Sequence, residues 1–144
     1  LIVPDSLVDV FVHAKAYNDR QSPMLEQHAL ADFIDEGHFE RHLRRMHHLY
    51  GRRRAALVHA LHRHFGEDVT IIGESAGMHL LARFATVRPN ADIAREAAQA
   101  GVFVTSAEPL YLRGGGHGEF VFGFAELDEE RIDEGIRRLA AVMH

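Results

Sequence analysis

The chain has 144 residues, no cysteine and a formal net charge of −5 at pH 7. This length fits one domain or part of one, and without cysteine neither a disulfide nor a thiolate metal site can form. The negative charge disfavours this piece as a DNA-binding surface, since phosphate contacts need clustered lysines and arginines. No apolar run approaches the roughly 18 residues of a membrane span and no signal peptide is present, so we expect a cytoplasmic location.

The first third of the chain predicts two helices. Leu1–Val3 is typical of the end of a strand, so we expect the chain to be the C-terminal portion of a longer protein. A helix opens at Pro4 and Asp5, and a second follows the polar break at 18–21. Apolar residues lie on one face of each helix: Leu7, Val8, Phe11 and Val12, then Leu30, Phe33 and Ile34. Ser22 can cap the second helix, and Gly37 can end it in the left-handed conformation.

One very long helix is predicted next, from His38 to Phe65. It carries an apolar stripe with spacings typical of a helix: Phe39, Leu43, Met46, Tyr50, Leu57 and Leu61. At 1.5 Å per residue this helix would be roughly 40 Å long. Such a helix suits a bridge between two lobes better than the core of a small bundle.

Strands and helices alternate in the remainder of the chain. Apolar, β-branched runs predict four strands: Val69–Gly73, Met78–Phe84, Val102–Val104 and Phe120–Phe124. Helical spacing predicts a helix after Pro89 and a last helix capped by Asp128, with these apolar residues: Ile93, Ala94, Ala97 and Ala98, then Ile132, Ile136, Leu139 and Met143. This order predicts an α/β fold in which helices pack on one face of a small sheet.

Several runs of sequence resemble a known family. The run LEQHALADFIDEGHFERHLRRM (25–46), continuing into LYGRRRAALVHAL (49–61), is similar to the aminotransferase-like domain of MocR-type transcription regulators. In order, VPDSLVDVFVHAK resembles the helix before the bridging helices, GMHLLARF a small-domain strand, and FVFGFAELDEERIDEGIRRLAAVM the C-terminal end. Those GntR-superfamily proteins join an N-terminal winged helix-turn-helix to a fold-type I pyridoxal-phosphate (PLP) domain.

The resemblance implies an architecture and a set of partners. Residues 1–36 would be the end of the large PLP domain with its linking helices. Residues 37–144 would be the long bridging helix and the C-terminal small domain, with a small, mostly antiparallel sheet. The intact protein would be a PLP-binding bacterial homodimer that senses an amino-acid or amine effector. It would bind DNA only through the missing winged helix-turn-helix. The alternative, a free-standing aminotransferase of the 2-aminoadipate kind, differs upstream of residue 1.

PLP chemistry requires a lysine that forms a Schiff base. The chain has one lysine, Lys15, in a predicted helix. The resemblance places the family's Schiff-base lysine, in a strand-end Ser-Lys motif, upstream of residue 1, together with its phosphate-binding arginine. We therefore expect the chain alone to hold no PLP covalently and to be catalytically inactive.

The resemblance also implies two contributions to a complete site. The segment 18–23 would approach the cofactor of the neighbouring subunit, which makes Arg20 and Ser22 candidates there; Ser22 as a helix cap alone remains open. An arginine that binds the substrate carboxylate opens the last strand of typical aminotransferases in a pattern like R-x-x-F, and Val121 stands in its place. Tyr111 and Arg113, in the preceding loop, are the candidates to substitute for it.

Two other motifs admit a chemical interpretation. Gly73–Gly77 (GESAG) fits the G-x-S-x-G nucleophile elbow of carboxylesterases, with Ser75 as the nucleophile. However, no glycine-rich oxyanion loop and no parallel strands precede it, so a tight turn between two strands is favoured. The glycine-rich loop Gly114–Gly118 leads into a strand instead of a helix, which favours a flexible hairpin connection over a phosphate cradle.

Histidine is unusually frequent, with 12 residues. Five of the histidines on the long helix form two groups, His47–His48 and His59, His62 and His64, and His59 and His62 share one face. Zinc would need a third ligand and a supporting shell, and neither is visible in the sequence. We therefore interpret most of these histidines as surface residues and expect no functional metal site.

Overall fold

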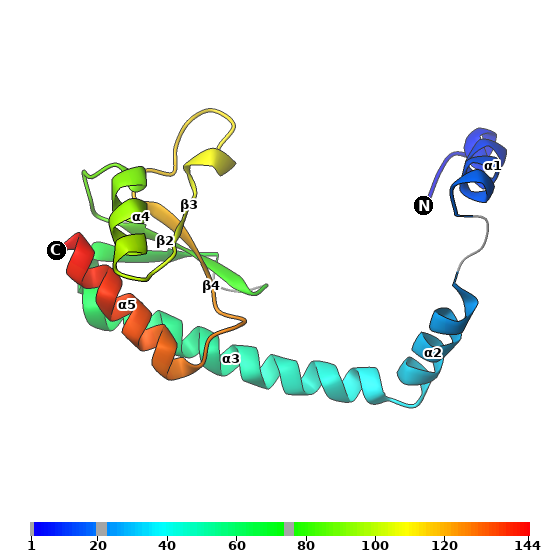
Figure 1. Cartoon of the computed structure of the whole chain (residues 1–144), viewed down its shortest axis with the longest axis horizontal. Coiled ribbons are helices and arrows are strands. Elements are labelled where there is room, and N and C mark those ends of the chain that lie inside the picture. The colour runs from blue at the N-terminus through cyan, green and yellow to red at the C-terminus, as the bar shows by residue number, and fades with distance from the viewer. Residues whose placement is uncertain (1, 20–22, 74–76) are drawn as a thin grey trace. The chain divides into compact units, whose positions relative to one another are not determined.

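The computed structural model describes residues 2–19, 23–73 and 77–144 (Figure 1). The chain divides into two compact units, one ending at Arg44 and the other beginning at Arg45. The boundary falls inside the long helix α3 (His38–Phe65), whose bounds agree with the prediction. None of the helices in the described ranges is both long and apolar enough to cross a membrane.

The first unit consists of helices. The 3₁₀ turn Asp5–Leu7 leads into α1 (Val8–Asp19), and α2 (Met24–Asp35) follows with Pro23 at its N-cap position. Gly37 has φ 73°, which confirms its role as the left-handed residue that separates α2 from α3. The ring of Phe33 on α2 lies 5.7 Å from that of His38 and 6.5 Å from that of Phe39, at the start of α3.

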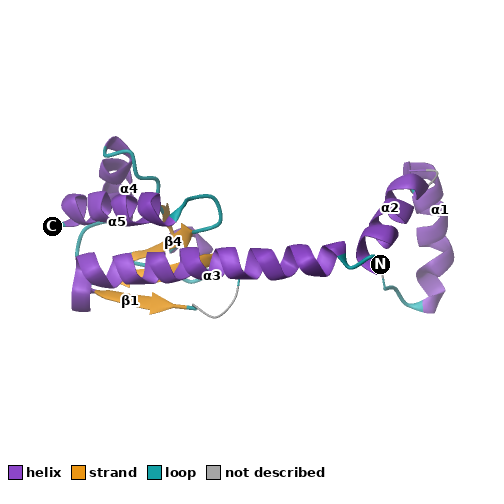
Figure 2. Cartoon of the chain, turned by 90° about the horizontal axis from the view of Figure 1, so that it is seen from below, coloured by secondary structure: helices purple, strands orange, loops and turns teal. Residues whose placement is uncertain are grey.

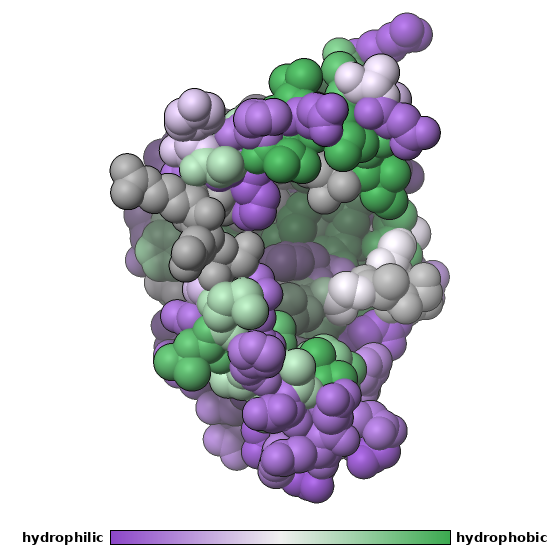
Figure 3. Space-filling view, turned by 90° about the vertical axis from the view of Figure 1, so that its right-hand side faces the viewer, coloured by the Kyte–Doolittle hydropathy of each residue, from purple (hydrophilic) through white to green (hydrophobic). Residues whose placement is uncertain are grey.

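No described residue of the first unit is buried. The apolar residues predicted to form the helix faces are instead 41–59% exposed: Leu7, Val8, Phe11, Val12, Leu30, Phe33 and Ile34. Figure 3 shows hydrophobic side chains exposed among hydrophilic ones on the surface of the molecule. Within the first unit, these apolar faces are therefore largely exposed, as is typical of surfaces that interact with another polypeptide.

The second unit contains one antiparallel sheet of four strands, in the order β1-β2-β4-β3. The strands are β1 (Val69–Ile72), β2 (His79–Phe84), β3 (Thr105–Ser106) and β4 (Glu119–Gly123). Helix α4 (Asn90–Gln99) lies between β2 and β3 in sequence, and α5 (Glu129–Met143) ends the chain. The α/β architecture predicted from the sequence is confirmed.

All three helices pack on the same face of this sheet. Along each strand every second side chain points to this face, and these side chains form a single core with those of α3, α4 and α5. The core includes Leu57, Leu61, Phe65, Ile93, Ala97, Ile132, Ile136 and Leu139 from the helices, and Val69, Leu80, Ala82, Phe84, Phe120 and Phe122 from the strands. Figure 2 shows α3 and α5 beside the strands. Within α3, the apolar stripe is buried only from Leu57 onward. Asp128 caps α5 as predicted, because its Oδ1 accepts a hydrogen bond from Arg131 N at 2.9 Å.

The third predicted strand is wrong. Val102–Val104 forms no strand, and β3 comprises only the next two residues. The reason is local. Gly101 has φ 77°, and Val102 N donates to Ala97 O at 2.8 Å, so this backbone still closes the C-terminus of α4. A β-branched run therefore lies beside the sheet without pairing to it.

Candidate functional site

One face of the sheet is left free by the helices, and we call it the open face. Side chains alternate along a strand, so the residues out of phase with the core share this face: Thr70, Ile72, His79, Leu81, Arg83, Thr105, Glu119, Val121 and Gly123. At its centre the half-buried Val121 lies opposite the half-buried Leu81. The open face therefore has an apolar centre.

A buried carboxylate lies next to that centre. Glu119 is 2% exposed and pairs across the sheet with Arg83. Arg83 donates to Glu119 Oε1 from Nε at 2.7 Å and from Nη2 at 2.5 Å. The hydroxyl of Tyr111 donates to Glu119 Oε2 at 2.6 Å. Both carboxylate oxygens are thus engaged, as a buried charge requires.

These contacts set the charge of the group. The hydrogen bond from Tyr111, assisted by those from Arg83, holds the pKa of Glu119 below its ordinary value, although burial acts in the opposite direction. The same contacts raise the pKa of Arg83 and of Tyr111, chiefly through the hydrogen bonds to Glu119. Glu119 is therefore ionised at neutral pH, and its charge is balanced by Arg83.

The loop that carries Tyr111 is held by a buried amide. Asn90, 1% exposed at the start of α4, donates from Nδ2 to Ser106 Oγ at 2.9 Å, Gly116 O at 2.8 Å and Glu119 O at 3.2 Å. Its Oδ1 accepts from Gly118 N at 2.8 Å. The glycine loop is therefore anchored to α4, which differs from the flexible connection expected from its composition.

Glycine at position 115 allows the aromatic ring to approach the backbone. A Cβ there would lie 2.8 Å from Cδ1 of Tyr111. At Gly118 a Cβ would lie 2.5 Å from the carbonyl oxygen of Phe84. The loop is rich in glycine because backbone and ring pack closely at these positions.

The structure unites only some of the residues proposed from the sequence. Tyr111 belongs to the network with Glu119, whereas the exposed Arg113 makes no hydrogen bond or ion pair within the described ranges. Arg20 and Ser22 lie outside the described residues. Sequence reasoning missed Arg83 and Glu119; their signal was a pair of opposite charges, Arg83 inside one predicted strand and Glu119 immediately before another. Asn90 gave no such signal.

Two further predictions concern the GESAG motif and the histidines. Ser75 lies outside the described residues, but the strands on either side of it, β1 and β2, pair antiparallel, unlike the strand-to-helix geometry of a nucleophile elbow. Within residues 2–19, 23–73 and 77–144, no group of three or more His, Asp or Glu side chains is placed to hold a metal ion.

Solved structures share this fold. The α-aminoadipate aminotransferase LysN of Thermus thermophilus, in complex with N-(5'-phosphopyridoxyl)-L-leucine, matches with a TM-score of 0.78 and 27% identity, over 99% of this chain and 36% of that chain. A multiple substrate aminotransferase of Thermococcus profundus matches with a TM-score of 0.81 and 22% identity, over 96% of this chain and 34% of that chain. The fold is that of the C-terminal domain of fold-type I PLP-dependent aminotransferases.

Sequence relatives give the family. The probable rhizopine catabolism regulatory protein MocR of Rhizobium meliloti is 34% identical over 139 residues, which are 96% of this chain and 28% of that protein. The 2-aminoadipate transaminase of Thermus thermophilus is 30% identical over 132 residues, 92% of this chain and 33% of the enzyme. No protein-family profile matches. The chain is homologous over nearly its whole length to MocR-type regulators and aminotransferases, and it spans about a third or less of these relatives.

The described residues do not fit covalently bound PLP. The one lysine, Lys15, is exposed on α1 and lines neither of the two hollows found in the second unit. A Schiff base needs a lysine enclosed with its cofactor.

Proposed function

We propose that this chain is the C-terminal, effector-sensing and dimerisation portion of the PLP-binding, aminotransferase-like domain of a MocR-type bacterial transcription regulator. The intact protein would bind PLP through an upstream lysine, form a cytoplasmic homodimer and contact DNA through an N-terminal winged helix-turn-helix. The proposal is supported by 34% identity to the MocR protein over 96% of the chain. The exposed apolar faces of α1 and α2 agree with a piece that is covered in a larger assembly.

The observation that carries the choice of a sensor over an enzyme is Val121. It occupies the centre of the open face, where the resemblance to aminotransferases implies an arginine for the substrate carboxylate. A valine side chain cannot pair with a carboxylate. The nearby guanidinium of Arg83 is already engaged by the buried Glu119. A domain with this face should bind an effector without turning over amino acids efficiently.

The second candidate, a free-standing aminotransferase, is favoured by the 30% identity to 2-aminoadipate transaminase and the 27% identity to LysN. The full-length gene product distinguishes the two. We expect its affinity for DNA upstream of its own gene to change at least severalfold with a panel of amines and amino acids. Transamination of 2-aminoadipate with 2-oxoglutarate should be negligible. Rapid turnover with no DNA binding would select the enzyme.

Val121→Arg tests the carrying observation directly. In the full-length protein, this variant should bind amino-acid effectors at least about tenfold more tightly, because a bidentate charge-assisted pair with a carboxylate becomes available. Leu81→Arg, on the facing strand, is the matched control and should give a smaller change. Equal effects of the two variants, or none, would contradict the assignment of the ligand-facing centre to Val121.

Finer assignments belong to the same proposal. We place the boundary between the large-domain end and the small domain at residues 1–36 and 37–144. Arg20 and Ser22 would contact the neighbouring subunit's cofactor, and Tyr111 with Arg113 would line the substrate side. Arg113→Gln should then weaken binding of a carboxylate effector by about tenfold while leaving its decarboxylated amine unaffected. Equal losses for both compounds would remove Arg113 from the site.

A further inference from the structure

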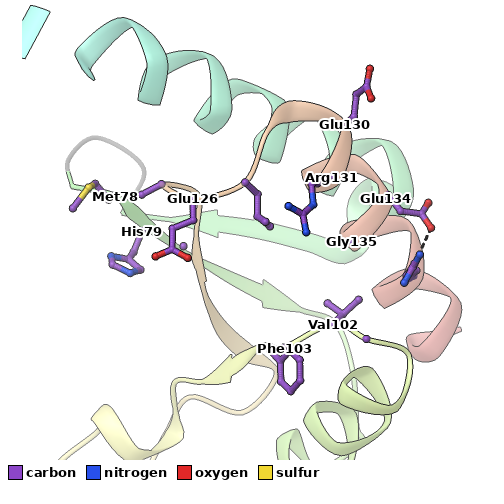
Figure 4. A pocket seen from close by; sticks show the side chains of 14 residues that line it. Met78, His79, Val102, Phe103, Glu126, Glu130, Arg131, Glu134 and Gly135 are labelled. Atoms are coloured by element: carbon purple, nitrogen blue, oxygen red, sulfur yellow. Dashed lines mark hydrogen bonds and ion pairs between the residues drawn. The ribbon is translucent and has the colours of Figure 1, made fainter. Parts of the chain in front are cut away.

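A groove opens where β3 and β4 diverge. Because β3 pairs with β4 only through Thr105 and Ser106, Val102–Val104 passes the end of β4 without strand pairing. Two adjoining hollows of about 380 and 980 Å³ lie between this segment, β4 and the first half of α5. Both are lined by these residues: His79, Val102, Phe103, Gly123, Leu127, Arg131 and Gly135. Figure 4 shows this region from close by.

The smaller, inner hollow is predominantly apolar. Val102, Val104, Leu110 and Leu127 belong to its lining, and Arg131 is the one lining residue of the Asp, Glu, Lys and Arg types. Its volume lies in the range of small-molecule sites, roughly 300–1,000 Å³, which combine apolar walls with a few placed polar groups. The inner hollow therefore suits a compact apolar group attached to one anionic group.

The guanidinium of Arg131 is available to such a ligand. Within the described ranges its side chain makes no hydrogen bond or ion pair, and only its backbone N–H is engaged, by Asp128. Figure 4 shows it directed toward the segment at Val102 and Phe103. By contrast, Arg137 and Arg138 on the same helix both pair with Glu134. An arginine without a partner beside apolar walls is suited to a carboxylate.

The rim of the larger hollow restricts the charge of the ligand. Glu126, Glu130 and Glu134 line it, and among the described residues only Glu134 of these three is paired with arginines. The two carboxylates that make no ion pair with a described residue, Glu126 and Glu130, repel additional negative charge on a ligand held by Arg131. His79, whose ring makes no hydrogen bond within the described part of the chain, offers a second donor to the ligand. The arrangement favours a monoanion over a dianion.

We infer that this groove binds a small monocarboxylate with an apolar body. The carboxylate pairs with Arg131, and the hydrocarbon part lies against Val102, Phe103 and Leu127. The inference needs no PLP and no residue outside the second unit. If the groove binds no monocarboxylate, the proposed regulator function is unaffected. If the protein is not a regulator, the inference about the groove is equally unaffected.

The test is calorimetric titration of the chain with 4-phenylbutyrate, its neutral analogue 4-phenylbutanamide and the dianion phenylsuccinate. We expect the monocarboxylate to bind at least about tenfold more tightly than the other two, because only it forms a charge-assisted hydrogen bond without rim repulsion. Arg131→Gln should remove that preference. Arg138→Gln, whose arginine is paired with Glu134, is the charge control and should change the affinity less than about twofold.

A variant that fills the groove with a larger side chain can block binding without disturbing the fold. Gly135 lines both hollows within α5, and a Cβ added there would meet no atom within 4 Å. Gly135→Leu should therefore block binding while favouring the helix. Gly51→Leu, at an equally open glycine of α3, is the matched control and should bind normally. Absence of 4-phenylbutyrate binding, equal affinity for the amide, or unchanged binding to Arg131→Gln or Gly135→Leu would each overturn the inference.

Discussion

Replacing Asn90 by alanine should destabilise the second unit through one loop. The substitution removes Asn90 Oδ1, which accepts the hydrogen bond of the buried Gly118 N–H. The carbonyls of Gly116 and Glu119 lose one partner each but keep the bonds from Glu119 N and Ala107 N. The orphaned donor costs about 1–3 kcal/mol, and the weakened carbonyls add a smaller amount. We expect the free energy of unfolding to fall by about 2–4 kcal/mol.

Urea denaturation followed by circular dichroism measures this change, and amide hydrogen exchange locates it. Exchange at Gly118 should accelerate much more than exchange in the centre of β2. Gln99→Ala, an exposed residue at the other end of the same helix, should change the free energy of unfolding by no more than about 0.5 kcal/mol. A loss below about 0.5 kcal/mol in Asn90→Ala, with unchanged protection at Gly118, would refute the view that Asn90 anchors the loop.

Further predictions concern the loop, the carboxylate, the lysine and the exposed helices. Glu119→Gln should lower the free energy of unfolding by about 1–3 kcal/mol at pH 7. The folded-state pKa of Glu119 is depressed, so its ionised form stabilises the fold above its unfolded pKa of about 4.3, and this stabilisation is lost as pH falls through the folded value. The stability difference between wild type and Glu119→Gln should therefore shrink in acid. A difference that does not depend on pH would exclude this linkage. Gly118→Ala should cost clearly more in thermal unfolding than Gly114→Ala, because both have positive φ but only the former meets a carbonyl oxygen; equal costs would contradict the close packing. When the chain is mixed with PLP and reduced with borohydride, no PLP adduct should form at Lys15. Detection of that adduct by mass spectrometry would disprove this prediction. Sedimentation should show self-association that Phe33→Glu reduces, whereas a monodisperse monomer at high concentration would count against it.

The fold was largely predictable because its strongest signals are local. The 3.6-residue period defined α3 to the residue, and Gly37 and Asp128 marked a break and a cap by their intrinsic chemistry. Pairing was less predictable. Val102–Val104 has the composition of a strand, but composition does not reveal that its backbone still closes the preceding helix.

The site was predictable only in part, because its contacts join residues far apart in sequence. Tyr111 was proposed from a resemblance, and the structure adds the reason for its position: a carboxylate eight residues later. Asn90 holds backbone groups 26 to 29 residues away, and no pattern in a single sequence marks such an amide. The groove at Arg131 depends on Val102–Val104 not pairing with β4, whereas the sequence predicted a strand at these residues.

The anchored glycine loop makes this chain convenient for spectroscopy. The protein contains no cysteine, and Leu112 at the loop tip is fully exposed, so Leu112→Cys would introduce a single thiol for a fluorophore or a spin label. Because the backbone on either side is fixed by Tyr111 and Asn90, the label would report displacement of the loop as a whole.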